Sequence, residues 1–119
     1  MSITQVLKKL VSKAYSTIPA SEAQSLLVER RAVLIDVRER HEWNTGHVAA
    51  AKHIPLGSLS GRMGEIPAGR PVITICQSGM RSARAAGLLA KQGHEVYNLR
   101  GGMSAWVATG LPVKGGGYR

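Results

Sequence analysis

The stretch that decides the fold, residues 72–90, reads VITICQSGMRSARAAGLLA. It opens with a β-rich apolar run, VITIC, and passes through the short loop QSGM into an alanine-rich segment that starts at Arg81. A strand that leads directly into a helix is typical of α/β proteins, in which helices connect parallel strands. Cys76, the only cysteine of the chain, lies at this transition. The stretch therefore predicts a fold and raises the question of what a lone thiol does there.

Other apolar runs extend the α/β pattern along the chain. AVLIDV, residues 32–37, and EVYNL, residues 95–99, have the length and composition of buried strands. Ser21 is placed to cap a helix over EAQSLLVER, residues 22–30, and a further helix is expected over residues 82–92. We therefore predict an α/β domain in which a central, mostly parallel β-sheet carries α-helices on both faces.

Composition limits the number of domains and the kinds of site. The chain has 119 residues, of which 44% are hydrophobic, and this fits one compact domain. Residues 56–70 are rich in Gly and Pro and are expected to form a short helix and a loop rather than a linker. A single cysteine excludes an internal disulfide and any multi-cysteine zinc or iron–sulfur site. No apolar stretch approaches the roughly 18 residues of a membrane span and no signal peptide is evident, so we expect a cytoplasmic protein.

The charge balance is strongly basic, with 16 Lys and Arg against 7 Asp and Glu, a net charge of +9. Such a balance attracts anions in general, including nucleic acids and anionic membranes. Only five residues are aromatic, two Trp and three Tyr, and there is no basic run, which disfavours nucleic acid. A small anionic molecule is at least as good a candidate partner.

The two ends of the chain differ from its body. Residues 1–14 carry three lysines and no acid, and their apolar residues recur at helical spacing, which predicts a basic amphipathic helix. This helix either packs on the domain or docks to a membrane surface or a partner. We favour packing, because interfacial helices usually carry larger anchors such as Trp or Phe. Residues 114–119 are expected to form a flexible tail.

Cys76 ends an apolar strand, and ligands of parallel sheets collect beyond the carboxyl ends of the strands. The loop after it contains Gly79, which permits a positive φ, and leads into a helix, so backbone N–H groups can converge on the sulfur. Such surroundings, with Arg81 and Ser82 close by, lower the pKa of a thiol. The competing interpretation is an ordinary buried thiol. We favour a reactive nucleophile.

Several motifs together resemble the family of single-domain rhodaneses. CQSGMRS is similar to their active-site loop, LIDVRERHEWNTGHV at residues 34–48 to their Asp-Val-Arg-Glu and Gly-His-Ile region, and HIP at 53–55 to a following strand end. LRGGMSAWVATGLPV, residues 99–113, is similar to their closing Gly-Gly, Trp and Gly-x-Pro pattern. The resemblance covers residues 15–113 and implies a single rhodanese-like domain.

The resemblance implies sulfur transfer in two steps. Cys76 would attack the outer sulfur of an anionic donor, thiosulfate or a persulfide, and hold it as a persulfide until cyanide or a thiol removes it. No metal or organic cofactor is implied. The loop residues that would bind the substrate are Gln77, Ser78, Gly79, Met80 and Arg81, and the residues that would support the loop are Asp36, Arg38 and Ser82.

The role of Arg81 has two interpretations. Its guanidinium would contact the anionic donor, or it would brace the loop through hydrogen bonds to backbone carbonyls. We favour bracing, because the helix N-terminus already stabilises an anion. Elsewhere, Arg38 and Glu42 are four apart and are expected to pair. Trp43 and Trp106 are expected to bury apolar area, His47 to be a hydrogen-bonded structural residue, and the two glycines after EVYNLR to let the chain turn.

Two other functions compete with this one. Dual-specificity phosphatases share the fold and use a Cys and an Arg separated by five residues, whereas four residues separate Cys76 from Arg81, so the loop should be too small for phosphate. The second alternative is a protein-to-protein persulfide carrier or a regulatory docking module without small-molecule turnover. The presence of Cys76 argues against an inert module, which could lose the thiol without penalty. It does not distinguish an enzyme from a carrier, because both would use the same persulfide.

Overall fold

The computed structural model describes residues 14–115. Its centre is a five-stranded sheet in the order β1-β5-β4-β2-β3, and every strand pair is parallel. The strands are β1 (Tyr15–Ile18), β2 (Val33–Asp36), β3 (Lys52–His53), β4 (Val72–Ile75) and β5 (Val96–Leu99). The α-helices are α2 (Ala20–Glu29), α3 (Arg40–Asn44), α4 (Met80–Lys91) and α5 (Gly102–Ala108), and two 3-10 helices, η1 (Leu56–Ser58) and η2 (Ser60–Glu65), lie between β3 and β4. The fold is the predicted α/β domain, with β4 at the centre of the sheet.

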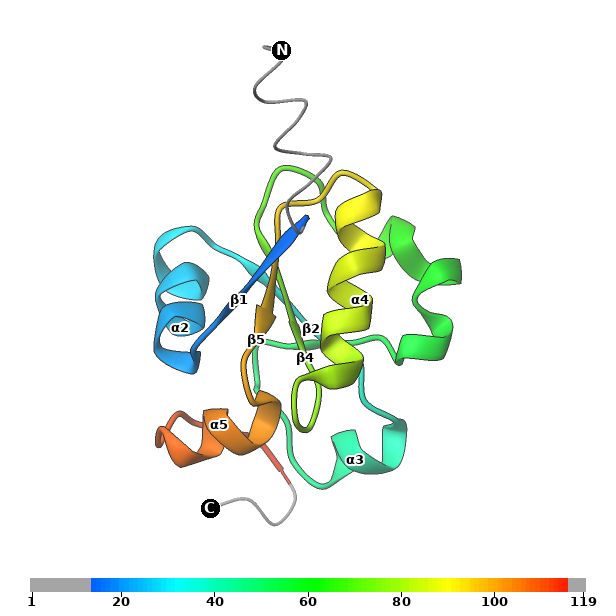
Figure 1. Ribbon diagram of the computed structural model, residues 1–119. Helices are drawn as coiled ribbons and strands as arrows, with labels where there is room; N and C mark the ends of the chain where they lie inside the picture. Colours follow the sequence, from blue (N-terminus) through cyan, green and yellow to red (C-terminus); the bar gives the residue numbers. More distant parts are fainter. Residues whose placement is uncertain (1–13, 116–119) are drawn as a thin grey trace.

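Helices cover both faces of the sheet (Figure 1). One core cluster lies on the side of α2 and α5 and includes Leu34, Ile73 and Trp106. The other lies on the side of α4 and the 3-10 helices and includes Ile35 and Leu89. Adjacent residues of one strand thus enter opposite cores, which is why the strands read as continuous apolar runs rather than alternating ones.

The observed elements differ from the predicted ones mainly at their ends. Each predicted strand is confirmed, but Cys76 lies one residue past β4 rather than inside it. The expected cap was wrong: α2 already begins at Ala20 behind Pro19, which has the extended backbone of an N-cap, so Ser21 is the second helical residue. Proline is well suited to this helix start, because it has no backbone N–H to donate and its ring disfavours a helical conformation in the residue before it.

Two strands carry no apolar run and were not predicted from composition. β1 is an edge strand, paired only with β5, and its two central residues are exposed. β3 has two residues and pairs only with β2. Their positions in the sheet depend on backbone hydrogen bonds to a neighbour, which a local sequence pattern does not reveal.

The predicted N-terminal helix, residues 1–14, lies outside the described residues except for its last position. At the other end Lys114, which we assigned to the tail, exchanges two backbone hydrogen bonds with His47, at 3.0 and 2.7 Å. Ordered chain therefore extends past residue 113. Between residues 14 and 115, no helix is both long and apolar enough to span a bilayer.

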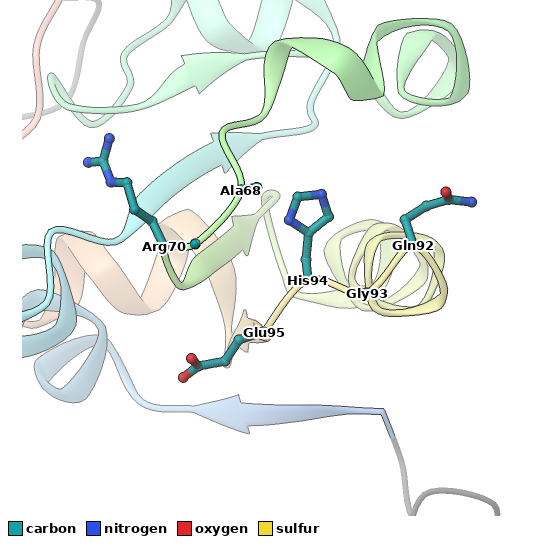
Figure 2. A pocket seen from close by; sticks show the side chains of 7 residues that line it. Ala68, Arg70, Gln92, Gly93, His94 and Glu95 are labelled. Carbon is teal, nitrogen blue, oxygen red and sulfur yellow. The ribbon is translucent and has the colours of Figure 1, made fainter. Parts of the chain in front are cut away.

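A polar hollow of about 280 Å³ lies between residues 68–70 and 92–95, next to the starts of β4 and β5. Figure 2 shows the guanidinium of Arg70 and the imidazole of His94 extending apart from each other. Arg70 donates to the Arg31 carbonyl at 2.7 Å. Because the hollow is at the amino end of the strands, it is on the edge of the sheet opposite to Cys76.

Candidate active site

Cys76 follows β4 at the carboxyl edge of the sheet and is only 1% exposed. The chain then makes a tight loop and enters α4 at Met80 (Figure 1). Gly79, the residue before the helix, has a φ of 109°, a backbone conformation that residues with a side chain rarely adopt. A Cβ at this position would also lie 3.3 Å from the backbone nitrogen of Gly101. The glycine therefore lets the loop fold tightly against the segment that follows β5.

The sulfur of Cys76 receives hydrogen bonds from the loop and from the first turn of α4. The backbone N–H of Gly79 donates to Sγ at 3.1 Å. Burial raises the pKa of the Cys76 thiol, but hydrogen bonds from the Ser82 side chain and from the backbone of Ser82, Gly79 and Ser78 lower it, and the net pKa is below the ordinary value. The helix start and the loop thus favour the thiolate.

The N-terminus of α5 holds the loop from the other side. Met103 N–H donates to the Cys76 carbonyl at 2.8 Å and Ser104 N–H to the Gln77 carbonyl at 3.2 Å. Gly102, with a φ of 54°, makes this approach possible, because a Cβ there would lie 2.2 Å from the Cys76 carbonyl oxygen. The glycine pair that was expected to turn the chain also brings a helix against the loop.

Asp36 and Arg38 form a buried ion pair at the end of β2, with no exposed area on either side chain. The Arg38 guanidinium donates to Asp36 at 2.9 Å, to the Gly46 carbonyl at 2.7 Å and to the side-chain oxygen of Gln77 at 3.4 Å. Full pairing compensates the desolvation of both charges. The pair thus links β2, the segment after α3 and the Cys76 loop.

Arg81 pairs with a carboxylate, whereas the expected bracing was through backbone carbonyls. Its guanidinium donates to both oxygens of Glu42, at 2.6 and 2.8 Å. This pairing contradicts the expected partnership of Arg38 with Glu42, since Arg38 reaches only the backbone carbonyl of Glu42, at 3.2 Å. Hydrogen bonding by Arg81 lowers the pKa of Glu42 to about 2, and the same bonds raise the pKa of Arg81.

A buried polar cluster lies beneath the loop. The Ser82 hydroxyl donates to the side-chain oxygen of Asn98 on β5 at 2.6 Å, and the Asn98 amide nitrogen donates to the Gly79 carbonyl at 3.2 Å. Thr74 of β4 donates to the Ser82 carbonyl at 2.8 Å. The sequence analysis did not identify Asn98 and Glu42 as site residues. For Asn98 a signal was available, because it is a polar residue inside the mainly apolar run EVYNL.

The outer side of the loop is open. Met80 is 81% exposed and Ser78 is exposed, whereas Gln77 is partly buried. The Gln77 amide nitrogen donates to the Ser104 hydroxyl at 3.3 Å. Met80 therefore presents an apolar side chain to solvent at the end of the loop that begins after Cys76.

The remaining predicted residues lie around the site or in the core. His47 donates a hydrogen bond through Nδ1 to the Trp43 carbonyl, 3.0 Å away, and its ring stacks on Trp43. Trp106 is buried, as expected, and donates to the Pro112 carbonyl. Trp43 is only partly buried and also stacks on His53. Within residues 14–115, no three His, Cys, Asp or Glu side chains are grouped to bind a metal ion.

A family model for the rhodanese-like domain matches residues 19–109, a range that includes the loop and all the residues that brace it. The chain belongs to this family of sulfurtransferase domains. The solved structure of a rhodanese-related protein from Thermoplasma volcanium is similar, with a TM-score of 0.77 and 28% identity over 84% of this chain and 98% of that one.

Two of the similar proteins are named as sulfurtransferases. A sulfurtransferase of Allochromatium vinosum is 39% identical over 78% of this chain and 88% of its own length. The thiosulfate sulfurtransferase GlpE of Actinobacillus pleuropneumoniae is 30% identical over 87% of this chain and 97% of its own length. An uncharacterized protein of Bacillus subtilis, YqhL, is 49% identical over 65% of this chain, and the match spans 62% of that protein.

Proposed function

We propose that this protein is a sulfurtransferase in which Cys76 carries a sulfane sulfur from thiosulfate, or from a persulfide donor, to cyanide or a thiol. In the first step the Cys76 thiolate attacks the outer sulfur of thiosulfate. A sulfur–sulfur bond forms to Sγ, the sulfur–sulfur bond of the donor breaks, and sulfite leaves with the bonding electron pair. In the second step the acceptor attacks the terminal sulfur of the persulfide and Cys76 leaves as the thiolate.

The observation that carries this proposal is the hydrogen bond from the Gly79 N–H to Cys76 Sγ at 3.1 Å, at the end of the central strand. Backbone donors held in place by a tight loop stabilise an anion without reorganising during the reaction. The pKa of Cys76 is lowered by the Ser82 side chain and by the backbone of Ser82, Gly79 and Ser78, which makes the thiolate, the nucleophilic form, more accessible.

Both cations beside the loop are already paired with carboxylates. Asp36 holds Arg38 and Glu42 holds Arg81. This arrangement leaves the stabilisation of the thiolate and the persulfide to the loop amides and the Ser82 hydroxyl. It also argues against a phosphatase, because a phosphate-binding arginine must face the nucleophile and Arg81 has both arms of its guanidinium on Glu42.

The test is the intact mass of the protein after incubation with thiosulfate. We expect the mass to rise by one sulfur atom and to return to its starting value when cyanide is added. The Cys76→Ser protein is the control and should take up no sulfur while keeping its circular dichroism spectrum. Thiocyanate production by Cys76→Ser near the wild-type rate, or wild-type protein that takes up no sulfur, would reject the proposal.

A protein acceptor is the second candidate, and the exposure of Met80 favours it. An apolar side chain that is 81% exposed beside a reactive thiol offers a contact that cyanide cannot use. Met80→Ser is therefore expected to slow sulfur transfer to a protein dithiol such as reduced thioredoxin and to leave transfer to cyanide unchanged. If Met80→Ser changes the rate of transfer to the protein dithiol and the rate of transfer to cyanide by the same factor relative to wild type, the exposure of Met80 no longer supports a protein acceptor.

A further inference from the structure

The Ser82 hydroxyl faces two possible acceptors at once. Its oxygen is 2.6 Å from the side-chain oxygen of Asn98, and the Ser82 side chain, in the first turn of the helix that follows the Cys76 loop, is also the group that most lowers the pKa of the Cys76 thiol. Ser82 and Asn98 are buried, at 0% and 4% exposure, so water does not replace either partner. A hydroxyl has one proton to donate. Asn98 and a Cys76 thiolate therefore compete for that proton.

The orientation of the Asn98 amide follows from its second contact. The amide nitrogen is 3.2 Å from the Gly79 carbonyl oxygen, which can only accept a hydrogen bond. The amide oxygen must then face Ser82 and act as the acceptor of its proton. An amide turned the other way would bring two acceptors together at Gly79.

The Gly79 carbonyl does not depend on Asn98 alone. The backbone N–H of Ala83, in the first turn of α4, also donates to it at 3.2 Å. The Gly79 N–H that faces the sulfur is thus held by the helix start as well. Removing the Asn98 amide therefore changes the partner of Ser82 more than it changes the path of the loop.

We propose that Asn98 is a positioning residue of the sulfur site, which acts through Ser82 by holding the hydroxyl proton that would otherwise be donated to the Cys76 thiolate. While Cys76 is a thiol, Ser82 donates to Asn98. When the thiol loses its proton to solvent, the Ser82 hydroxyl turns toward the sulfur and leaves the buried Asn98 oxygen without its donor, an unfavourable state. Asn98 thus limits how far the site stabilises the thiolate, and a less stabilised thiolate is a stronger nucleophile. Its bearing on sulfur transfer rests on the function proposed above.

The experiment measures the pKa of Cys76 from the pH dependence of its alkylation by iodoacetamide, which is unambiguous because the chain has one cysteine. Asn98→Leu, similar in shape but without an acceptor, should lower the pKa of Cys76 by about half a unit to one unit, because Ser82 then donates to sulfur alone. Ser82→Ala should raise the pKa. The double variant should match Ser82→Ala, since Asn98 has no route to the sulfur without the hydroxyl.

Thr74→Val is the matched control, because it removes a buried hydrogen bond to the Ser82 carbonyl and leaves the hydroxyl proton untouched. It should lower the melting temperature without lowering the pKa of Cys76. If Asn98→Leu does not fold, Asn98→Val, which suits a strand, takes its place with the same expected direction. An unchanged or raised pKa in the folded variant, or a shift that persists in the Ser82→Ala protein, would overturn the inference.

This readout separates the inference from the proposed function. Alkylation needs no sulfur donor, so a wild-type protein that takes up no sulfur would reject the function and still allow the pKa of each variant to be compared. Conversely, normal sulfur uptake with no pKa shift in Asn98→Leu would reject the role of Asn98 alone.

Discussion

Arg81, in the first turn of α4, donates hydrogen bonds to both carboxylate oxygens of Glu42 on α3, at 2.6 and 2.8 Å. The two residues are 39 positions apart in sequence, and their pairing ties the segment after β2 to the segment after β4. Glu42 is itself held at the start of α3, where its side chain accepts the Glu39 N–H at 3.0 Å in a capping box. Arg81 is thereby anchored to a helix start.

Arg81→Lys tests whether this pairing braces the site. Lysine keeps the charge but loses the forked geometry. We expect stability to fall by about 1 kcal/mol or less, because the pair is partly exposed, and sulfur transfer to fall about ten-fold, because the loop is less well positioned. Melting temperature and steady-state kinetics at low and high salt provide the measurement.

Arg62→Lys is the control for Arg81→Lys. Arg62 makes a similar forked contact with Glu65, at 2.7 and 3.0 Å, on η2 and outside the loop. It should leave sulfur transfer unchanged. If Arg81→Lys is mild, while Arg81→Ala raises KM for thiosulfate in a salt-sensitive way at unchanged stability, then Arg81 attracts the donor and does not brace the loop.

The depressed pKa of Glu42 predicts how acid acts on the site. A carboxyl with a pKa of about 2 in the folded protein and 4.5 otherwise stabilises the fold above pH 4.5, and this contribution is lost as the pH falls toward 2. We expect Glu42→Gln to be less stable than wild type at pH 7, and the difference to shrink steadily between pH 5 and pH 2. Urea unfolding at several pH values measures it. A difference that stays constant over this range would contradict the assignment.

Gly102→Ala tests the close approach of α5 to the loop. The new Cβ would lie 2.2 Å from the Cys76 carbonyl oxygen, so backbone must move. We expect a loss of roughly 3 kcal/mol or more in the free energy of unfolding, and slower persulfide formation in the protein that remains folded. Denaturant unfolding and the rate of sulfur uptake are the two measurements.

Gly110→Ala is the matched control, because Gly110 also has a positive φ, 82°, and nothing within 4 Å of its Cβ position. Backbone strain alone should cost about 1 kcal/mol there, with sulfur uptake at the wild-type rate. Equal losses in the two variants would mean that φ, and not the contact with Cys76, makes Gly102 necessary.

Deletion of residues 1–14 tests whether the basic N-terminal segment takes part in the chemistry. Tyr15, which follows the deleted residues, is paired with Val96 in the sheet, so the truncation leaves β1 complete. We expect the rate of persulfide formation to be unchanged, whereas stability, solubility or partner binding will differ. A truncated protein that folds but takes up no sulfur would make the segment part of the site.

Much of the fold follows from local pattern. The runs AVLIDV and VITIC contain one polar residue each and EVYNL contains two. They are mainly apolar because each strand is covered by helices on both faces, and the segments between them are long enough for crossover helices. The apolar pattern did not predict β1 and β3, because an edge strand is defined by its neighbour's hydrogen bonds and needs no apolar run.

The sequence by itself determined the α/β class, the position of Cys76 at the end of a strand, and a glycine-containing loop that leads into a helix. These are local features, set by the order of apolar runs, turn residues and helix formers along the chain. The partners of the charged and polar side chains were decided only by the tertiary structure. Glu42 is four residues from Arg38 and 39 from Arg81, yet its carboxylate pairs with Arg81, because Asp36 already occupies the Arg38 guanidinium in the buried end of β2. The contact of Asn98 with Ser82 likewise exists only because β5 and β4 are neighbours, which brings residues from separate strands and helices under one sulfur atom.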